Sequence, residues 1–185
     1  MYFDTSKSDF HAYFILYLYY RQVQYMDAVF DIQTIQNKLY AHQYQKLGTG
    51  SGRRVYQLDP EYSEYVLKAA YNRKGYAQNQ VEAYISETDD SPIFARIFFC
   101  DPDYRYLIME RAERISNISV LFEYFHVNNL KELFAIPELN DIILKYNLLI
   151  ADLRRPVNWG LIDSRPVIID YGFTKMVKRK YYSFF

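Results

Sequence analysis

Residues 152–172 read DLRRPVNWGLIDSRPVIIDYG and place three polar side chains around a predicted strand hairpin. Asp152 and Asn158 lie in a loop ahead of the hairpin, and Asp170 directly follows its β-branched second strand. Carboxylate and amide oxygens of this kind are hard ligands suited to Mg²⁺. Because Asp and Asn are also common turn residues, the stretch indicates a metal site only together with other signals.

A second signal is the glycine cluster at residues 48–52, GTGSG. The strand-like run Arg54–Leu58 follows it, so the cluster is predicted to be the tight turn of a hairpin. Since glycines carry no side chain, the backbone N–H groups of such a loop can approach a phosphate. A Rossmann loop would open a helix and a Walker loop would contain GK[ST], and the sequence has neither feature here.

The third signal is Lys68, in the middle of the apolar predicted strand Tyr65–Ala69. A buried, unpaired ammonium group is costly, so Lys68 is expected to have an acidic partner. Glu82 lies 14 positions later on the predicted helix 76–87 and is the natural candidate. A half-exposed strand lysine is the simpler alternative.

The other predicted elements complete an α+β pattern with a five-stranded antiparallel sheet. Residues 8–45 contain no Gly or Pro and have helical spacing, which predicts one or two helices beginning at Ser8 or Asp9. The remaining predicted elements are the strands 93–99 and 105–110, the helices 117–135 and 137–149, and the hairpin strands 159–162 and 166–169.

The composition favours one globular domain, since half of the 185 residues are apolar. Equal numbers of basic and acidic residues, 22 each, argue against nucleic-acid binding through a broad basic field and leave self-association open. The single Cys100 excludes an internal disulfide, and the three His have no zinc spacing. The 21 Tyr and 13 Phe favour an interaction partner, with a compositional bias of the source genome as the alternative. No secretory signal or membrane span is expected.

The order and separation of these signals resemble those of eukaryotic-type protein kinases, especially the short kinases of bacteria and bacteriophages. The resemblance covers residues 47–173. It implies a protein-kinase-like domain at 47–185, in which 47–112 form the small lobe and 113–185 a reduced, helical large lobe. Residues 1–46 would form a helical extension ahead of this domain.

Under this resemblance, one group of residues would bind ATP: Gly48, Gly50, Ser51, Gly52, Val55, Lys68, Glu82, Glu110 and Ala112. Those in the glycine loop would cover the phosphates, while Lys68 would contact the α- and β-phosphates and pair with Glu82. The backbones of Glu110 and Ala112 would face adenine, beside Met109 as the gatekeeper.

A second group would carry out the chemistry, with Lys68, Asp152 and Asp170 as the catalytic residues. Asp152 would be the base of the catalytic loop, and Asn158 and Asp170 would hold Mg²⁺. Catalysis would then consist of positioning and electrostatic stabilisation of the transferring phosphoryl group.

The sequence departs from the family pattern in three places. Gly52 stands one position before the usual third loop glycine, whose place Arg53 takes. The loop that begins at Asp152 follows Ile150-Ala151 in place of His-Arg, and it is one residue longer than usual. Only residues 173–185 follow the DYG motif, so no activation segment is expected.

These departures leave three functions open. An active kinase encoded by a phage or bacterium would use ATP and Mg²⁺ to modify Ser, Thr or Tyr of a host or viral protein. A pseudokinase-type binding or structural module, in a phage particle or in contact with a host protein, is the alternative. A small-molecule phosphotransferase of the aminoglycoside-kinase type comes last, because it usually has a larger C-terminal region. The expected partner is a protein, and the expected location is the cytoplasm, that of the host for a viral protein, or the virion.

Overall fold

The computed structural model describes residues 30–182 of the chain. The chain divides into two units, residues 1–44 and 45–185, a boundary two residues before the predicted one. In the described part of the first unit, helix α2 spans Ile32–Tyr40, and the Asp31 carboxylate caps it by accepting a 3.0 Å hydrogen bond from the Thr34 N–H. The predicted helix start at Ser8 or Asp9 lies outside the described residues.

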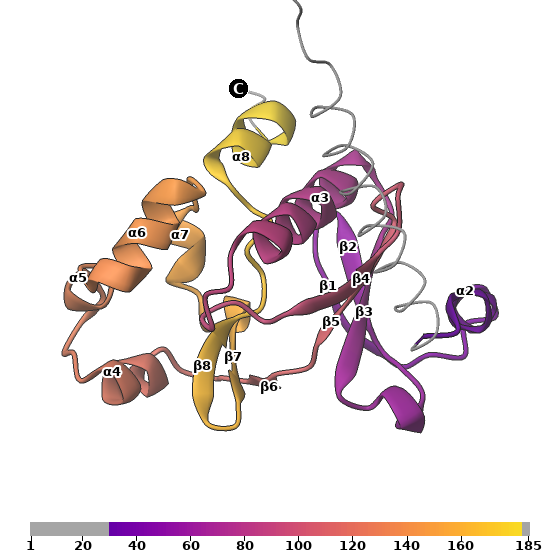
Figure 1. Ribbon diagram of the computed structural model, residues 1–185, viewed down its shortest axis with the longest axis horizontal. Coiled ribbons are helices and arrows are strands. Elements are labelled where there is room, and N and C mark those ends of the chain that lie inside the picture. The colour runs from indigo at the N-terminus through magenta and orange to yellow at the C-terminus, as the bar shows by residue number, and fades with distance from the viewer. Residues whose placement is uncertain (1–29, 183–185) are drawn as a thin grey trace, which may run out of the picture. The chain divides into compact units, whose positions relative to one another are not determined.

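The second unit confirms the predicted α+β class and its five-stranded antiparallel sheet. The strands are β1 (Lys46–Thr49), β2 (Arg53–Gln57), β3 (Tyr65–Ala70), β4 (Ile97–Cys100) and β5 (Tyr106–Glu110), in the order β1-β2-β3-β5-β4 (Figure 1). Consecutive residues are buried in two of the three inner strands, Val66 and Leu67 in β3 and Leu107 to Met109 in β5. Both faces of the sheet are therefore covered at its centre.

The predicted strand 93–99 begins only at Ile97. The residues before it leave the sheet and bond to Ile168, at the end of strand β8 (Arg165–Ile168). The Ile93 carbonyl accepts a hydrogen bond from Ile168 N–H at 2.6 Å, and the Ala95 N–H donates to Ile168 O at 3.1 Å. The first residues of the apolar run IFARIFF therefore bond to β8, and its last residues pair with β5. The hydrophobicity of the run alone does not reveal this division.

Helix α3, Arg73–Thr88, lies across one face of the sheet (Figure 1). It begins after Asn72, whose side chain accepts hydrogen bonds from the N–H groups of Lys74 and Gly75. Its buried side includes the polar residues Gln78, Asn79 and Glu82, along with Gly75, Ala83 and Ile85. A helix that buries polar side chains needs partners for them, and these partners define the site described below.

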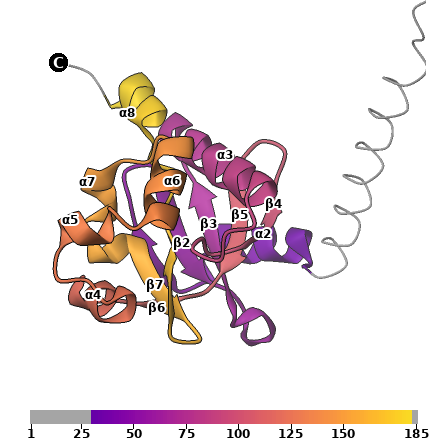
Figure 2. The same cartoon turned by 60° about the vertical axis from the view of Figure 1, so that its left-hand side comes forward.

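The rest of the second unit is mainly a small sheet and short helices, which lie mostly on the left in both views, while the last of these helices lies beside α3 (Figures 1 and 2). The small sheet contains β6 (Glu113–Arg114), β7 (Trp159–Ile162) and β8, in that order. The helices are α4 (Ser119–Phe125), α5 (Leu130–Leu133), α6 (Pro137–Lys145), α7 (Ile150–Leu153) and α8 (Lys175–Tyr181), with 3₁₀ turns at Pro60–Tyr62 and Pro156–Asn158. One hydrophobic cluster runs from Val66 and Met109 of the large sheet to Leu121, Ile142 and Trp159.

The predicted helix 117–135 was wrong, because two short helices occupy this range. His126 takes a left-handed conformation with φ of 55° and ends α4, and Asn129 caps the start of α5. The predicted helix 137–149 likewise ends at Lys145. Among residues 30–182, no helix has the length and apolarity needed to cross a membrane.

Two glycines allow the start of α3 to lie directly against the glycine turn. A Cβ atom added to Gly75 would lie 2.1 Å from the Gly52 carbonyl oxygen, and one added to Gly52 would lie 2.5 Å from the Gly75 nitrogen. The Tyr71 N–H also donates to the Gly52 carbonyl at 3.0 Å. The contact is between backbones, so it cannot be relieved by moving a side chain.

Gly75→Ala is therefore expected to lower the free energy of unfolding by about 1–3 kcal/mol, despite the better helix propensity of Ala. Urea denaturation followed by circular dichroism measures this change. Gly50→Ala is the matched control, because the nearest atom to its added Cβ would be 3.8 Å away. Equal stability of the two variants would contradict the close backbone contact.

Candidate functional site

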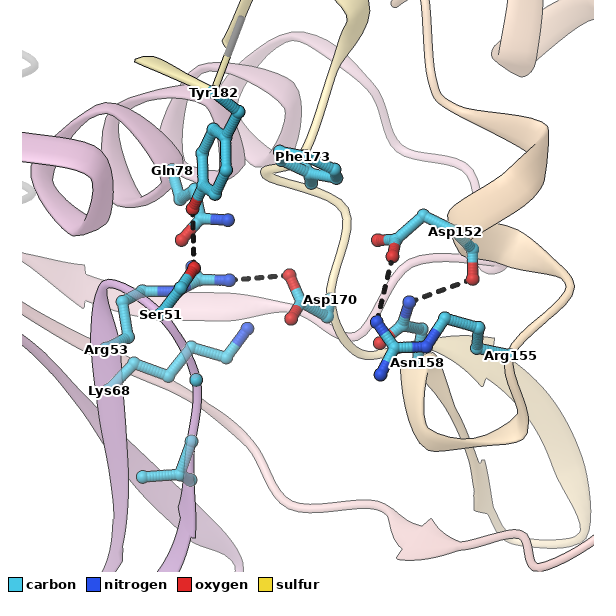
Figure 3. A pocket seen from close by; sticks show the side chains of 12 residues that line it. Ser51, Arg53, Lys68, Gln78, Asp152, Arg155, Asn158, Asp170, Phe173 and Tyr182 are labelled. Atoms are coloured by element: carbon cyan, nitrogen blue, oxygen red, sulfur yellow. Dashed lines mark hydrogen bonds and ion pairs between the residues drawn. The ribbon is translucent and has the colours of Figure 1, made fainter. Parts of the chain in front are cut away.

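A cavity of about 260 Å³ lies between the glycine turn, α3, the loop after β8 and the segment around α7 (Figure 3). Its lining residues are Gly50, Ser51, Arg53, Val55, Lys68, Gln78, Asp152, Arg155, Asn158, Asp170, Phe173 and Tyr182. They come from segments up to 132 positions apart in the chain, so only the fold brings them together.

Seven of the predicted site residues line this cavity, namely Gly50, Ser51, Val55, Lys68, Asp152, Asn158 and Asp170. Glu82 lies directly behind it, bonded to Lys68. Four predicted residues do not line it: Gly48, Gly52, Glu110 and Ala112. The Glu110 N–H donates to Arg96 O at 2.9 Å, and a Cβ added to Gly160 would lie 2.5 Å from the Ala112 Cβ, so this segment packs closely on β7.

The fold pairs Lys68 with Glu82, the partner that its burial requires. Lys68 Nζ lies 2.9 Å from Glu82 Oε2 and donates a second hydrogen bond to Ile169 O at 2.6 Å. The other carboxylate oxygen, Oε1, accepts from the N–H groups of Tyr171 and Gly172 at 3.1 Å each. The ion pair therefore also holds the backbone on both sides of Asp170.

Five residues that line the cavity were not predicted from the sequence, and Arg53 is the most buried of the charged ones; the others are Gln78, Arg155, Phe173 and Tyr182. The Arg53 side chain is 6% exposed, and its guanidinium donates to Glu82 Oε2 at 2.7 Å, to Asn79 Oδ1 at 3.2 Å and to Asp170 Oδ1 at 2.5 Å. The one sequence signal for this role was its position, where the family pattern has a glycine beside the phosphates. In Figure 3 the side chain reaches under the glycine turn toward Asp170.

Two buried cations and two carboxylates determine the electrostatics behind the cavity. Burial raises the pKa of Glu82, but the positive charges of Arg53 and Lys68 outweigh it and lower that pKa to about 2. Burial lowers the pKa of Arg53, yet Glu82 and Asp170 raise it above its ordinary value, so the guanidinium stays charged. For Lys68, burial and the neighbouring Arg53 prevail over Glu82, and its pKa is lowered.

Asp152 faces the cavity from α7, on the side opposite Lys68 (Figure 3). Burial and the negative charge of Asp170 raise its pKa, which makes it a better proton acceptor. Arg155 Nη1 lies 3.4 Å from the Asp152 carboxylate, and the buried Asn158 side chain donates to the Asp152 backbone carbonyl at 2.9 Å. The longer loop therefore folds into a helical turn that still brings the Asp152 side chain to the cavity.

The end of α8 covers the glycine turn at the mouth of the cavity. Tyr182 Oη lies 2.7 Å from Ser51 Oγ, and its ring packs edge-on against Phe173 with centroids 4.8 Å apart. Lys74 Nζ lies 4.2 Å from the same ring. No site was predicted in this segment, where Thr174 caps a regular helix by accepting from the Val177 N–H.

The predicted magnesium ligands do not form a metal site in this arrangement. One oxygen of Asp170 is bound to Arg53, while the Asn158 amide donates to the Asp152 carbonyl through its nitrogen, a bond that does not involve its oxygen. Among residues 30–182, no group of three or more His, Cys, Asp or Glu side chains could hold a metal ion. A resident Mg²⁺ at Asp170 would have to compete with a guanidinium, so the residues present do not fit it.

Glu82→Gln is expected to destabilise the fold by about 3–5 kcal/mol at neutral pH, because it leaves two buried cations without their main counter-charge. Chemical denaturation measures the loss. Glu87→Gln, an exposed position on the same helix, is the control and should change stability by less than about 0.5 kcal/mol. A small effect of both substitutions would contradict the role of Glu82.

The same carboxylate predicts the direction of the pH dependence. Its folded-state pKa lies below the ordinary value of 4.5, so its stabilising effect is complete above that pH and is lost as the pH falls toward 2. The stability difference between wild type and Glu82→Gln should therefore shrink between pH 5 and pH 3, as measured by denaturation at each pH. A constant difference would show that the Glu82 pKa is not depressed.

The chain matches none of the protein-family models and none of the curated proteins with which it was compared. What it does is therefore inferred from the side chains that surround the cavity.

Proposed function

We propose that this chain is a nucleotide-binding phosphotransferase of the protein-kinase-like kind, which transfers a phosphoryl group from ATP to a hydroxyl of a protein. The observation that carries the proposal is the buried Lys68–Glu82 pair, 2.9 Å apart, at the back of a cavity that Asp152, Asn158 and Asp170 also line. Perturbed titratable groups gathered in a cleft are typical of functional sites.

The cavity suits the phosphate end of a nucleotide. Its volume of about 260 Å³ is just below the range of roughly 300–1,000 Å³ for pockets that enclose a whole ligand. Lys68 would supply a positive charge from within, and Arg155, which is exposed at the opposite wall, would supply another. The assignment of Glu110 and Ala112 to the adenine stays a prediction, since neither lines this cavity.

Asp152 is the residue suited to accept the proton of the attacking hydroxyl. Its raised pKa favours proton uptake. Because Asp152 and Lys68 lie on opposite sides of the cavity, a bound phosphate would lie between their side chains. As the new O–P bond forms, the bond to the leaving ADP breaks and Asp152 takes the proton. Mg²⁺ enters this proposal only as part of the MgATP substrate, because Arg53 holds Asp170.

A binding module without transfer activity is the second candidate. Two observations favour it: the Arg53 guanidinium occupies Asp170, and Tyr182 bonds to Ser51 at the mouth of the cavity. In a binding module that transfers no phosphate, both contacts would serve to keep the cavity closed. Nucleotide binding and phosphate transfer, measured separately, distinguish the two functions.

Isothermal titration calorimetry with MgATP tests nucleotide binding, and incorporation of labelled γ-phosphate into protein tests transfer. Lys68→Met should weaken nucleotide binding about 10- to 100-fold, since it removes a charged hydrogen-bond donor. Asp152→Asn should leave binding unchanged and lower the transfer rate by about 10²- to 10⁴-fold. Lys131→Met, at an exposed position on α5, is the control.

The unfolding of each variant is followed without nucleotide, so that lost binding is not mistaken for lost structure. Absence of binding at millimolar MgATP would overturn the nucleotide proposal altogether. Binding without any transfer would select the binding module instead.

A further inference from the structure

The positive charge that lies against the Asp170 carboxylate comes from a side chain of the protein, Arg53. Arg53 Nη2 lies 2.5 Å from Asp170 Oδ1, while Nη1 of the same guanidinium bonds to Glu82 and Asn79. Acceptors on α3 and on the loop after β8 therefore fix both ends of this planar group. Asp170, whose side chain is 39% exposed, is the only one of its three partners that faces the cavity and is not fully buried.

The backbone of Arg53 is equally constrained. It is the first residue of β2 and pairs with Ala70 of β3. The preceding Gly52 lies against the backbone of Gly75, as described above. The guanidinium therefore cannot move away from Asp170 by a shift of the glycine turn alone, and a swing of the side chain would break its bonds to Glu82 and Asn79.

The charges behind the cavity are already balanced without a metal ion. The two cations Arg53 and Lys68 face the two carboxylates Glu82 and Asp170 at ion-pair distances. A divalent cation on Asp170 would lie next to the guanidinium that bonds to the same carboxylate, and their repulsion is strong in a partly buried site. No further acidic group completes a ligand set within the described part of the chain.

We infer that Arg53 takes the place of a divalent cation at Asp170. The guanidinium is a permanent counter-charge, so the protein does not ligate a metal through this carboxylate, and phosphate groups meet Arg53 and Lys68 rather than a protein-bound ion. The part of the inference that concerns phosphates rests on the proposed function. The part that concerns the metal does not require a nucleotide.

Binding of Mn²⁺ without nucleotide, measured by the electron paramagnetic resonance signal of the free ion, tests the inference. Wild type and Asp170→Asn should bind Mn²⁺ equally weakly. Arg53→Gln should bind it at least about tenfold more tightly, because the released carboxylate becomes a ligand. The double variant with Asp170→Asn should lose this gain.

Arg54→Gln is the matched control, since it removes one positive charge from an exposed neighbour on the same strand. Its Mn²⁺ affinity should equal that of wild type. An equal gain in both Arg variants would show a general charge effect and overturn the inference, and so would no gain in Arg53→Gln. If Arg53→Gln does not fold, the natural chain still decides: tighter binding by wild type than by Asp170→Asn overturns the inference.

Titration with ADP, in one buffer with EDTA and in another with Mg²⁺, tests the part of the inference that concerns phosphates. The wild-type affinities for ADP in the two buffers should agree within about threefold. The ADP affinity of Arg53→Gln should be about tenfold or more higher in Mg²⁺ than in EDTA. A strong Mg²⁺ requirement in wild type would overturn the inference. Absence of ADP binding in either buffer would overturn the proposed function, while the Mn²⁺ comparison would still decide the role of Arg53.

Discussion

The buried carboxylate of Glu82 is the interaction on which the rest of this structure depends. It is fully buried and accepts four hydrogen bonds, two from the side chains of Arg53 and Lys68 and two from the N–H groups of Tyr171 and Gly172. A buried charge is tolerated only with such partners, because its desolvation is costly. Through this one group, α3 is tied to β2, to β3 and to the segment after β8.

Close backbone contacts make this arrangement possible. Besides the contact of Gly52 with Gly75, a Cβ atom added to Gly172 would lie 2.5 Å from the Gln78 carbonyl oxygen. Any side chain at these glycines would push α3 away from the glycine turn or from the DYG segment. The distances between Glu82 and its four donors would then lengthen, so packing and electrostatics support each other here.

The cavity in front of Glu82 combines features of a phosphate site with features that close it. Lys68, Asp152 and Asn158 line it together, which is the arrangement that the proposed function uses. Arg53 neutralises Asp170, and Tyr182 bonds to the turn that would cover the phosphates. Under the proposed function, whether the protein is a transferase or a binding module depends on whether the Arg53 and Tyr182 contacts persist when a ligand enters.

Local pattern alone predicted the strands 54–58, 65–69 and 105–110 to within one residue at each end. It also predicted the glycine turn and the need of Lys68 for an acidic partner, because these follow from spacing and from the cost of a buried charge. Tertiary structure decided the direction of the Arg53 side chain, the division of 93–99 between two sheets, the break at His126 and the position of Tyr182. Apart from the break at His126, each of these depends on a group far away in the chain: Asp170 for Arg53, Ile168 for residues 93–95 and Ser51 for Tyr182. A periodic pattern reports which face of an element is buried, but not which distant group it meets there.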